Sequence, residues 1–530
     1  MVTNLRKVAG PIPVIDLFAG PGGLGEGFSA PGRDSGRSRF EIRLSIEKDT
    51  FAHQTLALRA FFRQFPYGEV PIEYYKFLRG EISRQTLFDG FKGEAEQAAL
   101  ETCPIPVELK EETAGQVREL IDVALGNTDR WVLIGGPPCQ LYSVAGRSRN
   151  RNKDRATIEG DVRQRLYVEY LQVIADHGPA VFVMENVKGL LTATLANQRT
   201  MERIVEDLKA PHKALVRENR TVARARDIHN YQLYSLNLGA DSDLPATQSL
   251  QDFLVHAEHH GVPQARHRII IIGVRDDIQR RPRALPVTDL VPAGAVLDGL
   301  PPLRSGLSHT ADSSEAWLGA LSGGLKKDWM RDTLKLAGDH ANDLQHLLVN
   351  TIKHIGVPKA GRGDEFVRCT PRVRYEPAWY LDERLGGVCN HRTRIHMTSD
   401  LYRYLYAACF ARIFRRSPEL RDFPKALLPD HRNVEDGLRK GYFDNRFCVQ
   451  LPNRPSMTIT SHISKDGHYY IHYDPRQCRS LTVREAARLQ TFPDNYYFCG
   501  VRTSQYVQVG NAVPPLLARE IAQVVYDLLR

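Results

Sequence analysis

The feature that most constrains the fold is a repeated alternation of short apolar runs with longer amphipathic stretches, from Pro13 to about Gly273. Apolar runs of four to six residues followed by helical stretches are typical of βαβ units, in which helices cover a parallel sheet. The pattern therefore predicts an α/β domain with its ligands at the carboxyl ends of the strands. The candidate strands are Val14–Phe18, Arg43–Ile46, Trp131–Ile134, Ala180–Met184 and Arg268–Gly273.

This alternation weakens between about Arg281 and Pro475, where Pro and Gly punctuate short irregular pieces. We interpret that region as a second domain. A clear helical pattern returns at the end of the chain, where Pro514 and Pro515 can open a helix. Its apolar face must pack on another element, because the apolar residues recur on one side: Leu517, Ile521, Val524, Val525 and Leu528.

Composition excludes several other classes of protein. The chain has 530 residues, 42% of them hydrophobic, and 71 Lys and Arg against 62 Asp and Glu give a net charge of +9. These values exclude wholesale disorder and favour a polyanionic partner. Apolar runs are too short to span a bilayer and no secretory signal is expected, so we expect a cytoplasmic protein. The eight cysteines form no CxxC pair, which argues against a disulfide framework or a zinc ribbon.

A glycine-rich segment follows the first predicted strand, with GxGxxG spacing at Gly20, Gly22 and Gly25. Such a turn brings backbone N–H groups and the start of a helix close to a ligand. An acid, Glu47, ends the second predicted strand and could bind ribose hydroxyls. A dinucleotide and S-adenosylmethionine both fit this arrangement, and the loop alone does not choose between them.

Cys139 follows two prolines directly after the third predicted strand. A lone cysteine is more often a buried, inert residue, but this one is expected at the ligand edge of the sheet on a stiff turn. Nearby cations lower the pKa of a thiol and so favour the reactive thiolate. The basic run that follows is either a solvated loop or a contact to a phosphodiester backbone: Arg147, Arg149, Arg151, Lys153 and Arg155.

Two further groups of polar residues flank predicted strands. Glu185 follows the fourth strand between apolar neighbours, so it could have a raised pKa and donate a proton, or it could simply form a salt bridge. Gln264, Arg266 and Arg268 precede the fifth strand. Alternation along an extended segment points these three side chains to one side, where guanidinium groups can contact a carbonyl or phosphate oxygen.

With these residues in view, the chain resembles the DNA (cytosine-5) methyltransferase family, of the prokaryotic restriction-modification or phage-defence type. The resemblance covers about 300 residues in six blocks that stand in the family's order. The blocks are Asp16–Gly23, Gly136–Ser143, Glu185–Val187, Gln264–Arg268, Arg479–Gln490 with Phe492 and Pro493, and Gln508–Val513. It implies a Rossmann-like S-adenosylmethionine-dependent methyltransferase domain with a second, irregular target-recognition domain.

The resemblance also implies a mechanism. Cys139 would attack C6 of a flipped-out cytosine while Glu185 shares a proton with ring N3, so that C5 accepts the methyl group of S-adenosylmethionine. Arg268 would hold the cytosine O2, and Arg266 would steady the catalytic loop and a phosphate. No metal is expected, because Cys389, His391 and His396 lack a convincing fourth ligand.

For the cofactor, the family implies contacts from Phe18, Ala19, Gly20, Gly22, Gly23, Leu24, Glu47, Lys48, Glu81, Pro137, Leu166, Asn511 and Val513. Two positions depart from the family pattern. Lys48 stands where many relatives have an aromatic residue against adenine. Glu81 matches the aspartate of a Gly-Asp-Ile block only within a short segment, and a long insertion follows it.

The expected domains are a catalytic domain at 1–290, a target-recognition domain at 291–478, and a hinge and helix at 479–530 that return to the catalytic domain. The expected DNA contacts are Ser143, Arg147, Arg149, Arg151, Gln264, Arg392 and Arg394. The expected partners are double-stranded DNA, which would associate the protein with the nucleoid, and a cognate restriction endonuclease or other defence proteins. The alternatives are an RNA cytosine-5 methyltransferase, a non-catalytic DNA-binding regulator of the same fold, and, on the glycine loop alone, a dinucleotide oxidoreductase.

Overall fold

A computed structural model describes residues 10–30, 38–138, 162–195, 198–222, 228–237, 249–309, 311–336, 338–430, 434, 438–439 and 446–530. The chain forms two compact units. The first contains 1–71, 85–289 and 512–530, and the second contains 72–84 and 290–511. Residues 479–511, expected to belong to a hinge that returns to the catalytic domain, thus group with the second unit.

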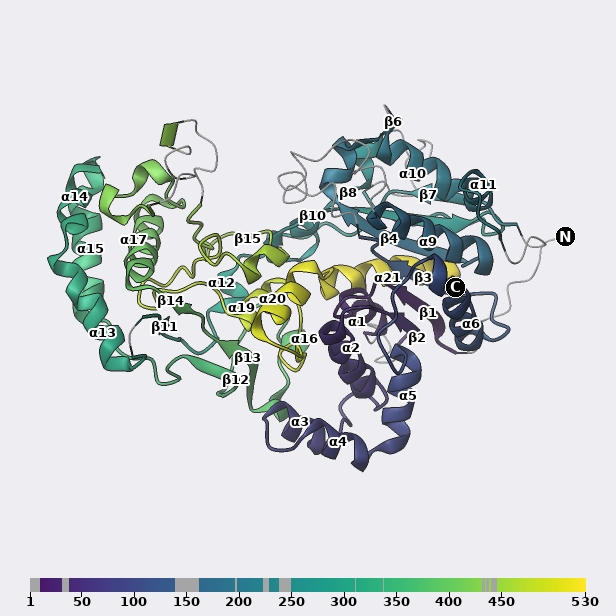
Figure 1. Ribbon diagram of the computed structural model, residues 1–530, viewed down its shortest axis with the longest axis horizontal. Helices are drawn as coiled ribbons and strands as arrows, with labels where there is room; N and C mark the ends of the chain where they lie inside the picture. The colour runs from purple at the N-terminus through teal and green to yellow at the C-terminus, as the bar shows by residue number, and fades with distance from the viewer. Residues whose placement is uncertain are drawn as a thin grey trace. The chain divides into compact units, whose positions relative to one another are not determined.

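A seven-stranded sheet forms the centre of the first unit (Figure 1). All five strands predicted from the sequence are present, and their ends differ from the predicted ones by at most about three residues. Two strands beyond those five complete the sheet. In spatial order the strands are β2 (Phe40–Ile46), β1 (Ile12–Leu17), β3 (Val132–Gly135), β4 (Val181–Val187), β10 (His267–Arg275) and β7 (Tyr231–Tyr234), with β8 (Leu254–His256) also paired to β10.

The expectation of a parallel sheet is wrong for β10. Strands β2, β1, β3 and β4 are parallel, but β10 runs antiparallel to β4, β7 and β8. Arg268 pairs with Val187 and Ile270 with Glu185. The start of β10 therefore lies beside the carboxyl end of β4, at the edge of the sheet where ligands bind in such folds.

Alternate residues of the strands face opposite sides of the sheet, and each side is covered by helices. One core contains Val14 and Ile134 together with α1 and α21; the other contains Ile15 and Leu133 together with α6, α9, α10 and α11. The predicted C-terminal helix is thus confirmed, and its apolar face packs on the sheet and α1.

The helices of this unit are α1 (Gly23–Ser29), α2 (Thr50–Arg63), α4 (Arg84–Gly90), α5 (Lys92–Thr102), α6 (Ala114–Leu125), α9 (Val162–His177), α10 (Thr200–Lys209), α11 (Pro211–Arg217) and α21 (Pro515–Leu529). The first residue of α4 belongs to the second unit.

The second unit contains more helix than its weak sequence periodicity indicates. Its core forms around α17 (Thr398–Phe414), which is buried from Asp400 to Ala411 and so shows no single apolar face. The other helices are α3 (Ile72–Leu78), α12 (Gly294–Leu297), α13 (Ser314–Gly323), α14 (Asp328–Leu336), α15 (Ala341–His354), α16 (Pro377–Tyr380), α19 (Val483–Leu489) and α20 (Arg502–Asn511), and its longer strands are β12 (Gly363–Arg368) and β13 (Gly387–Arg392). In the described part of the chain, no helix combines the length and apolarity that crossing a membrane requires.

Helices α1 and α21 approach closely at Gly27. A Cβ atom at this position would lie 2.4 Å from the Cβ of Ala518 and 2.5 Å from the carbonyl oxygen of Pro515. We expect Gly27→Ala to destabilise the protein by roughly 1–3 kcal/mol, because the two helices must move apart. Calorimetry should show a lower Tm.

Gly115→Ala is the matched control, since Gly115 also lies in a helix but has open space around it. Its replacement should leave the free energy of unfolding unchanged or raise it by up to roughly 1 kcal/mol, and the Tm should follow in the same direction. An unchanged Tm for Gly27→Ala would contradict the close packing of α1 on α21.

Asp16 is a fully buried carboxyl group near the end of β1. Neither of its oxygens has a hydrogen-bond partner of normal geometry among the described residues. Burial raises its pKa to about 8, although Arg63 and the backbone N–H of Gly25 favour the charged form. The side chain is therefore mostly neutral at neutral pH.

This raised pKa predicts a specific pH dependence. The folded state binds the Asp16 proton more tightly than the unfolded state, so the contribution of Asp16 to stability falls as the pH rises from about 4 towards 8. In Asp16→Asn the free energy of unfolding, relative to wild type, should rise by up to roughly 1.4 kcal/mol per pH unit in this window. Denaturant unfolding at about pH 5, 6.5 and 8 measures the slope.

Asp276→Asn provides the control, because it makes the same chemical change at an exposed position. A difference in the free energy of unfolding that is the same at every pH reports only the effect of the new amide group. A difference that changes with pH reports the titration of Asp16. A flat difference for Asp16→Asn would show that the carboxyl is already ionised in the folded protein.

Candidate active site

The glycine loop connects β1 to α1 and takes a conformation that requires glycine. Gly20 and Gly22 have φ of 59° and 93°, in the left-handed region. The backbone N–H of Ala19 donates to the carbonyl of Ile46 (3.1 Å), which fastens the loop to the end of β2. A Cβ at Gly23 would lie 2.2 Å from the carbonyl oxygen of Val513, whereas Gly20 has open space beside it. The loop is thus packed on one side and open at Gly20.

Glu47 follows β2 and faces this loop. One carboxylate oxygen accepts the backbone N–H of Gly20 (2.8 Å), and the other accepts those of Lys48 (2.9 Å) and Asp49 (2.7 Å). Burial raises the pKa of Glu47, and the three N–H donors oppose this effect. A carboxylate has about four acceptor sites, so Glu47 can still accept a hydroxyl hydrogen. Its orientation is fixed before any ligand binds.

The insertion that follows the predicted Gly80-Glu81-Ile82 block returns to this part of the site, which the sequence did not indicate. The backbone N–H of Val107 donates to the carbonyl of Glu47 (3.0 Å), beyond the end of β2. Lys48, the first departure from the family pattern, forms an exposed ion pair with Glu108 (2.9 Å). The ammonium group of Lys48 is therefore held by an acidic neighbour from the insertion.

Glu185 and Arg268 form the central polar pair. Glu185 lies on β4 and Arg268 near the start of β10, and the Nε of Arg268 is 2.9 Å from the Oε1 of Glu185. Their side chains are only 13% and 15% exposed, so the pair is largely shielded from water but still accessible. Burial lowers the pKa of Arg268 and the carboxylate of Glu185 opposes the shift. Two residues predicted separately are thus brought together.

The segment leading to Cys139 lies against Glu185. A Cβ at Gly136 would be 3.0 Å from the Oε2 of Glu185, so glycine allows the carboxylate to approach the backbone. The side-chain amide of Asn186 donates to the carbonyl of Pro137 (3.3 Å), which joins the ends of β4 and β3. Cys139 itself lies outside the described residues, as do the expected DNA contacts Ser143, Arg147, Arg149 and Arg151.

Three further predicted residues of the first unit are buried, whereas Phe18 and Ala19 are partly exposed. Arg266 is 1% exposed, and its guanidinium donates to the carbonyl of Ala512 (2.8 Å), next to Val513. Gln264, in the short strand β9 (Gln264–Ala265), is fully buried, and Leu166 of α9 is also buried. Arg266 therefore holds the segment before α21 in the described structure, and its role towards a phosphate remains a prediction.

Four predicted residues belong to the second unit. Asn511 is exposed at the end of α20, and Glu81 is exposed and accepts a hydrogen bond from Arg79 (2.7 Å). Arg392 is half-exposed and lies 3.7 Å from Asp364. Arg394 is held inside the unit, since it donates to the carbonyls of Ile463 and Ser464 and stacks over Tyr506.

The second unit also contains a cavity of about 510 Å³ that sequence reasoning did not reveal. Apolar residues such as Leu300 and Val449 line part of it, and Arg412 and Arg415 line another part. Arg412, Arg415 and Arg416 belong to one basic segment of the sequence, residues 412–416. Arg416 does not face the cavity but pairs with both oxygens of Asp422 (2.6 and 2.9 Å). Of this run, therefore, Arg412 and Arg415 face the cavity while Arg416 is neutralised within the fold.

The chain is similar in sequence to known DNA methyltransferases. The family model for C-5 cytosine-specific DNA methylases matches residues 108–211 and 400–527. The chain is 29% identical to Type II methyltransferase M.Bpa9945I of Bacillus paralicheniformis, over 97% of this chain and 99% of that protein.

It is 26% identical to Type II methyltransferase M.AgeI of Thalassovita gelatinovora, over 96% of this chain and 98% of that protein. It is also 26% identical to DNA (cytosine-5-)-methyltransferase M.ApeKI of Aeropyrum pernix, over 97% and 98% of the two chains. These similarities extend over nearly the whole length of each protein and agree with the family match. The chain is therefore a DNA methyltransferase that is similar to the C-5 cytosine-specific DNA methylases.

Proposed function

We propose that this protein transfers a methyl group from S-adenosylmethionine to carbon 5 of a flipped-out cytosine, within a specific sequence of duplex DNA. Cys139 is the nucleophile in this proposal. The enzyme protects host DNA in a restriction-modification or phage-defence system, as the Type II methyltransferases among its relatives suggest. It acts where the genome is, bound to DNA in the nucleoid.

The observation that carries the proposal is the pair of Glu185 and Arg268 beside Gly136. Cytosine presents a ring nitrogen, N3, between a carbonyl oxygen, O2, and an amino group. A carboxyl group beside a guanidinium complements this edge, because the carboxyl can bond N3 and the amino group while the guanidinium donates to O2. The same edge is paired with guanine inside a duplex, so the base must leave the stack to reach Glu185.

These residues divide the chemistry between them. Cys139, which lies three residues after Gly136, attacks C6 of the cytosine as a thiolate. Glu185 stabilises the adduct by sharing a proton with N3, which makes C5 electron-rich. Arg268 holds O2 and keeps the ring in the plane of Glu185. Loss of the C5 proton and release of Cys139 then restore the enzyme.

The residues at the glycine loop fit S-adenosylmethionine. Glu47 can accept a ribose hydroxyl, and the open side of Gly20 leaves room for a ligand beside the backbone. When bound, this cofactor supplies an electrophilic methyl group. Phe18 and Leu24 would line the adenosine, and Val513, which packs on Gly23, would close the far side of the loop. Lys48 would lie over adenine with its charge shared by Glu108.

The direct test is methyl transfer to nucleic acid with radioactive S-adenosylmethionine. Wild-type enzyme should label duplex DNA, and Cys139→Ser should reduce the rate to below about one thousandth, because serine is a far weaker nucleophile at neutral pH. Equilibrium dialysis should show that Cys139→Ser still binds the cofactor. Cys369→Ser is the matched control, since burial raises the pKa of Cys369 to about 11 and it should retain activity.

The nucleic acid that receives the label separates the alternatives. Label in transfer RNA and none in duplex DNA would identify an RNA methyltransferase, and cofactor binding without any transfer would indicate a non-catalytic regulator. Bisulfite sequencing of DNA from a host that expresses the chain should then show 5-methylcytosine in one short sequence context.

Glu185→Gln tests the carboxyl group separately from the thiol. The amide keeps the size of the side chain but loses the charge that pairs with Arg268, and it cannot share a proton with N3. We expect a decrease in kcat of about 10²–10⁴-fold with little change in cofactor binding. Single-turnover kinetics measure this step.

Glu206→Gln is the control for Glu185→Gln, because Glu206 is exposed on α10 and should be replaceable without loss of rate. Wild-type turnover in Glu185→Gln would remove Glu185 from the proposed mechanism while leaving the role of Cys139 intact.

A further inference from the structure

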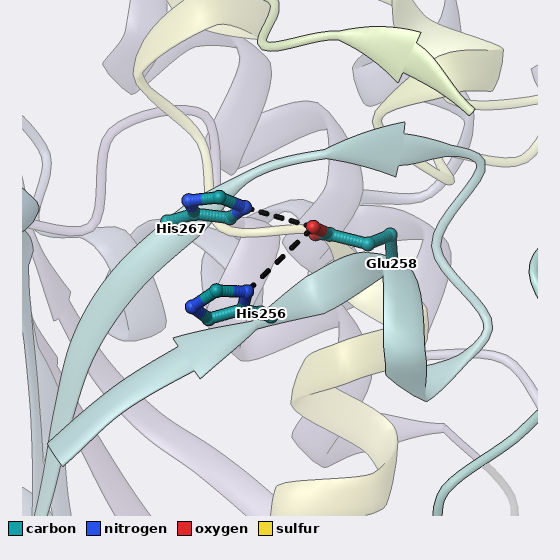
Figure 2. A group of neighbouring side chains, drawn as sticks. All are labelled: His256, Glu258 and His267. Atoms are coloured by element: carbon teal, nitrogen blue, oxygen red, sulfur yellow. Dashed lines mark hydrogen bonds and ion pairs between the residues drawn. The ribbon is translucent and has the colours of Figure 1, made fainter. Parts of the chain in front are cut away.

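A group of three potential metal ligands lies where β8 meets β10, separate from the groups assigned to methyl transfer. His256 ends β8 and His267 begins β10, and the two residues are directly paired in the antiparallel ladder. Glu258 lies in the 3-10 helix η4 (Ala257–His260) that follows β8. Figure 2 shows both imidazole rings directed at the carboxylate of Glu258.

The contacts within this group are short. The Oε1 of Glu258 is 2.8 Å from the Nε2 of His267 and 3.9 Å from the Nδ1 of His256. The two imidazole rings are stacked, with centroids 3.9 Å apart and an interplanar angle of 19°. One potential ligand atom from each residue lies within 4.8 Å of the other two.

Glu258 supplies a second, independent observation. The residue is only 8% exposed, and its other carboxylate oxygen, Oε2, is buried with no hydrogen-bond partner among the described residues. A buried, unsatisfied carboxylate oxygen is costly unless another group neutralises it. A cation bound beside Glu258 would satisfy this oxygen.

We propose that His256, Glu258 and His267 form a binding site for a divalent transition metal ion, with Zn²⁺ as the best match. Two imidazoles and one carboxylate are a known ligand set for zinc, with water in the fourth position. Metal–ligand bonds of about 2.0–2.2 Å in a tetrahedral arrangement place ligand atoms about 3.4 Å apart. The observed separations of 2.8 and 3.9 Å lie on either side of that value. Because the two rings are stacked, both imidazoles would have to tilt towards the ion to complete the site.

The position of this site suggests what the ion would do. His267 directly precedes Arg268 in β10, and alternation along the strand points the two side chains to opposite faces. An ion held by His256, Glu258 and His267 would cross-link β8, η4 and the first residue of β10. It would stabilise the strand start that presents Arg268 without contacting the substrate. The site does not depend on the proposed function, because none of its ligands is assigned a role in methyl transfer.

The test uses the untagged full-length protein, stripped with a chelator and then titrated with Zn²⁺ in competition with a chromophoric chelator. We expect one Zn²⁺ per chain at the site, and its affinity should fall at least about tenfold in His256→Ala, Glu258→Gln and His267→Ala. His259→Ala is the matched control, because His259 is exposed and its ring lies 6.0 Å from that of His256, outside the group. Titration with Co²⁺ should give the visible absorption of a four-coordinate ion in wild type and His259→Ala only.

Thermal unfolding with and without Zn²⁺ provides a readout that does not rely on stoichiometry. Zn²⁺ should raise the Tm of wild type and of His259→Ala, and not that of Glu258→Gln. If His267→Ala does not fold, His256→Ala and Glu258→Gln decide the question. Equal Zn²⁺ affinity and equal Tm shifts in wild type and in these two variants would overturn the proposal and place any bound zinc elsewhere.

Discussion

The direction of β10 is the constraint on which the rest of the site depends. The carboxyl ends of β1, β3 and β4 lie at the edge of the sheet where ligands bind. Because β10 is antiparallel to β4, its first residues, and not its last, lie at that edge. Pairing of Ile270 with Glu185 and of Arg268 with Val187 makes Glu185 and Arg268 diagonal neighbours. A parallel β10 would carry Arg268 to the opposite edge, roughly 20 Å away. The ion pair of Glu185 and Arg268 exists because one strand is reversed.

Much of the fold could be predicted from the sequence, because short buried strands and an amphipathic terminal helix have clear local patterns. The glycine loop could also be predicted, since its conformation requires particular glycines. Strand direction could not be predicted in the same way, because a fully buried strand such as β10 has the same apolar pattern whether it is parallel or antiparallel. Helix α17 was missed for a related reason: it is buried on nearly all sides and has no polar face to reveal its period.

The parts of the site that escaped prediction are those that depend on distant pairing. Glu108 meets Lys48 only because an insertion of no obvious pattern returns to β2. His256 and His267 stand 11 positions apart in the sequence, and only the ladder between β8 and β10 makes them neighbours. Local patterns, by contrast, were enough to predict that Glu185, Arg268 and the glycine loop lie near the ends of strands, and their roles stay predictions.

The contact between α1 and α21 has a consequence for how the protein is made. One core of the first unit needs α21 to cover it, yet α21 is synthesised only after all of residues 290–511. During synthesis the face of the sheet that contains Val14 and Ile134 must remain uncovered while the whole second unit emerges from the ribosome. The nascent first unit thus exposes this apolar surface until α21 has been synthesised and packs on it.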